Sequence, residues 1–176
     1  MNNTNPYQAP QSPAEDTANI PAEGPKGLGG WLILVCIGLC GSILRLSLIL
    51  VNTYLPIFVQ NQWELFTTPG YEYYHPLWRP LLLFEIAANL VILMLSGYLL
   101  YLFFTKSRRF PRFFIGWLLL GLFFVISDLF LSNLIPAVAG ADKTESLREI
   151  SRTIAYALIW IPYMLLSERV KNTFVE

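Results

Sequence analysis

Long hydrophobic runs without charge are the feature that most constrains this chain. The clearest extends from Ile86 to Thr105 and contains no Asp, Glu, Lys or Arg. A helix of about 20 apolar residues crosses the hydrocarbon core of a bilayer, so this run is long enough for one span. Four spans can be placed, at about residues 30–51, 81–104, 113–134 and 149–166. The sequence therefore predicts an all-α integral membrane protein, a bundle of four transmembrane helices.

The fourth span is defined less sharply than the others. Its uncharged part, Thr153–Ser167, is too short to cross a bilayer alone, so the span must also include Glu149 and Arg152. The fourth helix is therefore expected to carry charge in its first two turns.

The overall composition agrees with a membrane protein. Hydrophobic residues make up 55% of the 176 residues and charged residues only 14%, whereas a soluble domain carries about 25% charged residues. The mean hydropathy is +0.49. With 12 Lys and Arg against 12 Asp and Glu, the chain lacks the basic excess typical of nucleic-acid binding. The predicted partner is the lipid bilayer, and no nucleic acid is expected.

The distribution of cations predicts the orientation. The segment between the second and third spans carries four cations and no anion, and such segments face the cytoplasm. With four spans, both termini then lie in the cytoplasm, an N-in and C-in topology. The C-terminal segment adds two cations on the same side. The predicted topology-setting cations are Lys106, Arg108, Arg109, Arg112, Arg169 and Lys171.

Residues 1–27 differ from the rest of the chain. They contain five prolines among mostly small and polar residues, a composition that does not support a helix. The anions Glu15, Asp16 and Glu23 precede the first hydrophobic run, where a signal peptide would carry cations. We therefore expect a disordered, proline-rich cytoplasmic tail at 1–27 and a four-span membrane domain at 28–174.

One charged residue in each predicted span lies near its outer end, at Arg45, Glu85, Asp128 and Arg152. At 1.5 Å per residue, all four fall within roughly 5–10 Å of the outer boundary. An unpaired ion at the bilayer centre costs about 2.5–3.5 kcal/mol, so mutual pairing is expected. Asn89 follows Glu85 by one helical turn. The sequence predicts an intramembrane polar cluster, open to the outer side, of Arg45, Glu85, Asn89, Asp128 and Arg152.

Two interpretations of this cluster remain open. In the first, the ion pairs fix which helices are neighbours, and the long arginine side chains reach the outer headgroups. In the second, the cluster forms the floor of a cavity that binds an ion, a proton or an anionic ligand. Ionisable residues inside a membrane are functional candidates by default.

Three other segments allow two interpretations each. Residues 52–79 are rich in Tyr, Trp and Phe, which favours a loop or short helix at the outer headgroups over a lid or ligand-binding face. Cys36 and Cys40 are expected to be small buried side chains rather than a redox pair. Val170 and Phe174 give the C-terminal segment a short apolar edge, which predicts a membrane anchor rather than a docking motif for a cytoplasmic partner.

Three short motifs carry a family resemblance. They are GLGGWL at residues 27–32, WIPY at 160–163 and SERVKNTF at 167–174. Together they resemble the YdgK-like family of bacterial inner-membrane proteins, a domain of unknown function with four predicted spans, over residues 27–174. The resemblance implies a bacterial inner-membrane location and supports four spans. It implies no activity, so it assigns no catalytic residue.

The sequence contains no nucleophile–base motif, metal-ligand spacing or glycine-rich nucleotide motif. No catalytic residue, cofactor or metal is therefore predicted, and an enzyme is the least favoured class. The predicted function is that of a non-enzymatic accessory or interaction protein, in contact with another membrane protein or a second copy of itself. The alternative is a small transporter or ligand-binding membrane protein that uses the polar cluster.

Overall fold

The structure is a computed structural model that describes residue 24 and residues 26–175. Most of the predicted tail, 1–27, thus lies outside the described residues. Within the described residues every regular element is a helix and there is no strand. The helices are α1 (Trp31–Ile49), η1 (Leu50–Tyr54), α2 (Leu55–Val59), α3 (Gln62–Thr67), α4 (Trp78–Phe104), α5 (Phe110–Ser132), α6 (Pro136–Ala139), α7 (Thr144–Leu166) and α8 (Glu168–Thr173).

Three helices of the described part are long and apolar enough to cross a membrane. They are Trp31–Val59, in which α1 continues through the π-helical turn η1 into α2, together with α4 and α5. Helix α7 has 23 residues, as many as α5. It is less apolar because Glu145, Arg148, Glu149 and Arg152 all fall in its first half.

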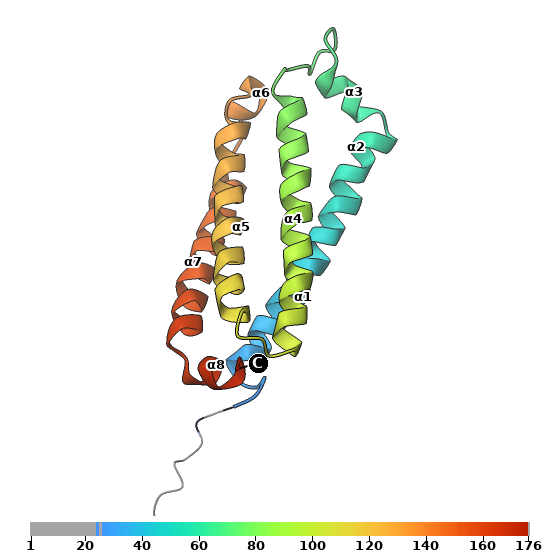
Figure 1. Cartoon of the computed structure of the whole chain (residues 1–176). Coiled ribbons are helices and arrows are strands. Elements are labelled where there is room, and N and C mark those ends of the chain that lie inside the picture. Colours follow the sequence, from blue (N-terminus) through green and yellow to red (C-terminus); the bar gives the residue numbers. More distant parts are fainter. Residues whose placement is uncertain (1–23, 25, 176) are drawn as a thin grey trace, which may run out of the picture.

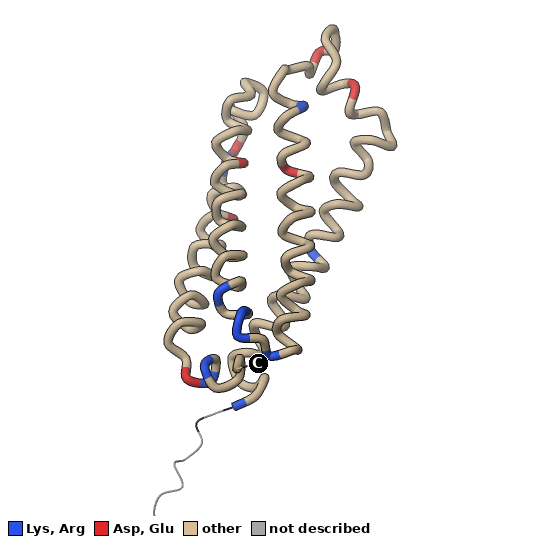
Figure 2. Tube along the Cα trace, viewed as in Figure 1, with Lys and Arg blue, Asp and Glu red and all other residues tan. Residues whose placement is uncertain are grey.

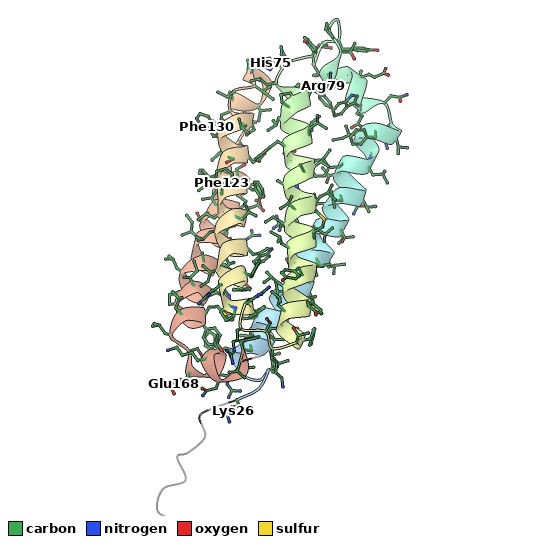
Figure 3. All side chains as sticks on the ribbon, viewed as in Figure 1. Lys26, His75, Arg79, Phe123, Phe130 and Glu168 are labelled. Carbon is green, nitrogen blue, oxygen red and sulfur yellow. The ribbon has the colours of Figure 1, made fainter. Side chains whose placement is uncertain are left out.

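The long helices form an antiparallel bundle (Figure 1). Helix α4 packs between α1 and α5, and α7 packs along α5. The start of α1, the α4–α5 turn and α8 lie together at one end, which we call the terminal end. Helices α3 and α6 lie at the opposite end, the loop end. Figure 3 shows His75 and Arg79 at the loop end and Lys26 and Glu168 at the terminal end.

The buried core lies at the terminal end. Its members come from α1, α4, α5, α7 and α8, so that all four long helices and the C-terminal helix share one apolar centre. They are Leu32, Val35, Leu39, Leu99, Leu102, Phe103, Phe110, Phe114, Leu118, Trp160, Met164, Val170 and Phe174. Towards the loop end the long helices keep large apolar side chains on the outside, such as Phe123 and Phe130 on α5 (Figure 3), which are 59% and 67% exposed.

The apolar edge of the C-terminal segment packs inside this core. Val170 is 1% and Phe174 5% exposed, and the Phe174 ring stacks on Phe110 with ring centroids 4.6 Å apart. The edge is therefore already covered by the chain's own bundle. Neither sequence interpretation, an anchor in the lipid or a docking motif for a partner, describes it.

The aromatic segment 52–79 is more helical than expected. Residues up to Val59 extend the first long helix, α3 forms a further short helix, and α4 already begins at Trp78. Pro80 falls in the first turn of α4, where the missing N–H has no helical acceptor to lose. Pro56 follows directly on the π-helical turn η1 within the first long helix. Among the rings, Phe66 contacts Trp78 with centroids 5.1 Å apart.

Cys36 and Cys40 are both free thiols. Cys36 is partly buried, whereas Cys40 is exposed. The prediction of two buried cysteine side chains is thus wrong for Cys40, because no neighbouring element covers its face of α1.

Candidate functional site

Tyr54, at the end of η1, connects the first long helix to α4. Its hydroxyl group donates a hydrogen bond of 3.0 Å to Oε2 of Glu85. The side-chain amide of Asn89, one turn along α4, donates to the Tyr54 oxygen at 3.3 Å and to the backbone oxygen of Glu85 at 2.8 Å. These bonds hold the Glu85 carboxyl group between two helices.

The Glu85 carboxyl group also meets Asp128 on α5. The two carboxyl groups are near enough to interact electrostatically. The Asp128 oxygen Oδ1 is buried and has no hydrogen-bond partner among the described residues.

An ion pair between Arg45 and Glu149 completes the arrangement. Arg45 lies on α1 and Glu149 on α7, and a guanidinium nitrogen of Arg45 donates to Oε1 of Glu149. Glu149 is also near enough to interact electrostatically with Asp128. The Arg45 side chain is 58% exposed and that of Glu149 35% exposed. The ion pair therefore lies at the surface of the bundle. We call these six residues the polar network: Arg45, Tyr54, Glu85, Asn89, Asp128 and Glu149.

The polar network contains four of the five residues singled out from the sequence. The structure brings Arg45, Glu85, Asn89 and Asp128 together through the contacts above. It does not bring Arg152 to them: that side chain is exposed, and no ion pair joins it to another described residue. The expected balance of two cations and two anions is therefore replaced by three acidic groups and one arginine.

Glu149 and Tyr54 are the members that sequence reasoning missed. Glu149 lies on the same stripe of α7 as Thr153, Tyr156 and Trp160, at helical spacing, and Trp160 is buried in the core. That stripe is the signal that could have identified Glu149 as inward-facing. Tyr54 falls in the segment expected to be a loop or short helix at the outer headgroups, so its ring was expected at the interface and not beside Glu85.

A second polar contact lies nearer the core. Ser96 on α4 is fully buried. Its hydroxyl oxygen accepts a hydrogen bond of 3.0 Å from the indole nitrogen of Trp117 on α5, and Ser42 on α1 donates to it at 3.4 Å. Beyond Ser96, towards the terminal end, the apolar core fills the centre of the bundle. The polar network is therefore separated from the terminal end by packed apolar side chains.

The residues predicted to set the topology gather at the terminal end, as Figure 2 shows for the α4–α5 turn and α8. Arg108 donates a hydrogen bond from Nε to the backbone oxygen of Val175, and the Arg169 guanidinium lies over Gly29 and Gly30. The others at this end are Lys106, Arg109, Arg112 and Lys171.

The arrangement offers acid–base and ion-pairing groups but no metal centre. Within the described residues, no group of three or more His, Cys, Asp or Glu side chains converges to hold a metal ion. The polar network presents carboxyl, guanidinium, phenol and amide groups, which can orient a charged or hydrogen-bonding ligand.

Comparison with known proteins places the chain in a family. A family model described as a protein of unknown function, DUF2569, matches residues 25–175. The chain belongs to the DUF2569 family. The match covers the bundle of this DUF2569 protein from the start of α1 to α8. The narrower resemblance to the YdgK-like family stays a prediction. No curated protein and no solved structure matches the chain significantly.

Proposed function

We propose that this DUF2569 protein is a four-span, non-enzymatic protein of the bacterial inner membrane that acts by interaction at its outer side. Helix α7 is the proposed fourth span, in addition to the first long helix, α4 and α5. Its 23 residues give a length of about 34 Å, which exceeds the roughly 30 Å of a bilayer's hydrocarbon core. Its charged half lies towards the loop end, where Glu149 pairs with Arg45 and Arg148 with Glu145.

The proposed orientation puts the terminal end in the cytoplasm. Six of the chain's 12 Lys and Arg are the topology-setting cations of the α4–α5 turn and the C-terminal segment, and cations of short segments favour the cytoplasmic side. Both termini then lie in the cytoplasm, and the polar network lies near the outer boundary.

Labelling of single cysteines in intact cells tests the four spans and the orientation. In a background with Cys36 and Cys40 replaced by alanine, Lys143→Cys should react with a membrane-impermeant maleimide added outside. Lys171→Cys should react only after the inner membrane is permeabilised. Labelling of both positions from outside would show that α7 does not cross the membrane, and the reverse pattern would overturn the orientation.

The position of the polar network relative to the core supports interaction over transport. Counted from the terminal end of each helix, Glu85, Asp128 and Glu149 lie at about 29, 27 and 26 Å. They thus share one level near the loop end, while apolar side chains fill the bundle below Ser96. A polar site that opens on one side and is sealed on the other is suited to binding, not to passage. This one-sided arrangement carries the proposal.

Site-specific photo-crosslinking tests the interaction. A photoreactive amino acid in place of Tyr73, 60% exposed at the loop end, should give a discrete protein adduct in cells. The matched control is Phe123, 59% exposed on α5 and more than one turn below Asp128 towards the terminal end, where lipid is the expected neighbour. Adducts of a second membrane protein or of a second copy support the proposal. The same diffuse pattern from both positions would refute it.

A small transporter or ligand-binding protein is the second candidate. It is favoured by the excess of acidic groups, since Glu85, Asp128 and Glu149 face a single arginine, Arg45. Ion pairs that only held helices together would be balanced. Proton flux into vesicles reconstituted with purified protein distinguishes the two. Interaction alone predicts no flux above that of protein-free vesicles. Flux that is lost in Glu85→Gln, at unchanged protein level, would replace our proposal with the second candidate.

The role of the acidic pair can be separated from simple stabilisation. Glu85→Gln and Asp128→Asn preserve the shape of each side chain and remove its ability to ionise. If the pair only holds α4 against α5, either variant should change the membrane level and the melting temperature. If both stay as in the wild type, the structural role is excluded.

A further inference from the structure

At the terminal end, the turn between α4 and α5 forms an open pocket of about 320 Å³. Its lining combines two tyrosines, two hydroxyl side chains, one arginine and a buried leucine. The lining residues are Tyr98, Tyr101, Leu102, Thr105, Ser107 and Arg109. The pocket lies beside the turn that joins the last residue of α4, Phe104, to the first residue of α5, Phe110, and both helices are long and apolar enough to cross a membrane. This is the level of the phospholipid headgroups on that side.

The backbone holds the polar residues of the pocket in place. The N–H of Ser107 bonds to the oxygen of Leu102 at 3.0 Å, and the N–H of Lys106 to the oxygen of Phe103 at 3.2 Å. Lys106 has a φ of 51°. These features make a Schellman motif that closes α4, with Lys106 at the left-handed position that glycine usually occupies. The backbone N–H of Arg109 then bonds to the Ser107 hydroxyl oxygen at 3.4 Å, which leaves the hydroxyl proton free to donate.

The charge of the pocket favours an anion. The segment from Lys106 to Arg112 contains four cations and no acidic residue. Arg108 is engaged by the oxygen of Val175. The guanidinium of Arg109 is exposed and has no hydrogen bond or ion pair with another described residue. A planar guanidinium binds phosphate oxygens with two parallel hydrogen bonds, and a serine hydroxyl can add a third.

The apolar side of the pocket favours a lipid over a free ion. The ring of Tyr98 contacts Phe113 of α5 with centroids 5.5 Å apart. Phe113 is 44% and Tyr101 63% exposed, so both present apolar surface beside the polar groups. Aromatic side chains of this kind are typical of the membrane interface, where one end of the ring meets headgroups and the other meets acyl chains.

We propose that this pocket binds the phosphate of an anionic phospholipid such as phosphatidylglycerol, with Arg109 and Ser107 as its ligands. The tyrosine rings and Phe113 flank the glycerol and the upper acyl chains. This inference requires only that α4 and α5 lie in the membrane. It does not depend on the proposed interaction at the loop end.

Native mass spectrometry of the full chain tests the proposal. The protein is released from mixed micelles that contain phosphatidylcholine and phosphatidylglycerol in equal amounts, and the retained lipids are counted. We expect the wild type to retain phosphatidylglycerol in preference. A basic residue near an anionic surface contributes about 1 kcal/mol, so Arg109→Gln should reduce this preference about fivefold. Arg148→Gln is the matched control, because Arg148 is an exposed arginine in the first half of α7, and it should keep the preference.

Ser107→Ala separates a defined pocket from general attraction by charge. It leaves the net charge unchanged and removes only a hydroxyl group, and we expect it to reduce the preference as well. An equal loss in Arg109→Gln and Arg148→Gln, or no loss in Ser107→Ala, would overturn the pocket as the binding site. All variants are compared as monodisperse protein with the wild-type melting temperature in neutral detergent.

A competition arm distinguishes lipid from free phosphate. Inorganic phosphate in the millimolar range should displace retained phosphatidylglycerol only weakly, because it offers no apolar part for Tyr98 and Phe113. Complete displacement by inorganic phosphate, or no preference for phosphatidylglycerol in the wild type, would refute a lipid site.

Discussion

Replacement of Phe174 tests whether α8 is an integral part of the bundle. The ring is 5% exposed and contacts Phe110 and Phe103, with centroid distances of 4.6 and 5.9 Å. Truncation of a buried phenylalanine to alanine costs about 3–5 kcal/mol. Because α8 is short and near the chain end, it can partly collapse into the space, so we expect the lower value. Phe174→Ala should thus lower the free energy of unfolding by about 3 kcal/mol.

The assay is reversible unfolding in mixed detergent micelles, followed by tryptophan fluorescence. Val175→Ala is the matched control, since Val175 is the next residue and is 48% exposed. A surface substitution of this kind changes stability by no more than about 0.5 kcal/mol. If the two variants have the same effect within error, α8 does not pack on the bundle and the reasoning fails.

A second variant examines the hydrogen bonds of the same helix. The Thr173 hydroxyl accepts a bond of 3.0 Å from the N–H of Gly27 and donates one of 3.3 Å to the Gly27 oxygen. Thr173→Val keeps the shape of the side chain and removes both bonds. Because the Gly27 N–H then lacks its partner, we expect a loss of about 1–3 kcal/mol in the same assay. An unchanged midpoint would show that this link between the two ends of the domain does not contribute to stability.

Two further predictions concern the middle of the bundle and its loop end. A Cβ added at Gly38 would lie 2.5 Å from the Tyr156 hydroxyl oxygen, whereas one added at Gly41 would meet nothing within 4 Å. Gly38→Ala should therefore lower the melting temperature, whereas Gly41→Ala should not. Tyr156→Phe should partly restore the melting temperature of Gly38→Ala. Equal effects of the two alanine variants would contradict the close approach of Tyr156 to Gly38. The hydroxyl and N–H groups of Thr144 bond to Asp142 and hold the pKa of its carboxyl group below the ordinary value of 3.8. The stabilisation is thus present above the unfolded-state pKa and lost as the pH falls through the lower folded-state pKa. Thr144→Ala should raise this pKa in an NMR titration, and an unshifted curve would contradict the assigned cause.

The acidic members of the polar network show where sequence reasoning succeeded. Glu85 and Asp128 interrupt otherwise apolar helices, and their expected depth followed directly from helical rise. That both would lie in one polar cluster could be predicted without side-chain packing, because polar groups at one level in a membrane bundle have few other partners.

The assignment of Arg152 shows where sequence reasoning failed. Glu149 and Arg152 are three residues apart on α7, so their sequence positions fit the same depth almost equally well. The rotation of α7 about its own axis decides between them. That rotation is set by Trp160, whose ring contacts Trp31 of α1 with centroids 6.0 Å apart, and by Tyr156 against Gly38. These contacts turn the stripe of Glu149 inward and leave Arg152 exposed.

The sequence by itself determined the helical class, three long hydrophobic segments and the depth of Glu85 and Asp128 along their helices, whereas Arg45 lies deeper than expected because the first long helix continues to Val59. These properties depend on local composition and on a fixed rise per residue, which no tertiary contact alters. The tertiary structure decided which charges meet, and it placed Phe174 in the core instead of in lipid or against a partner. It did so because helix rotation and chain-end docking depend on packing between segments that are far apart in sequence.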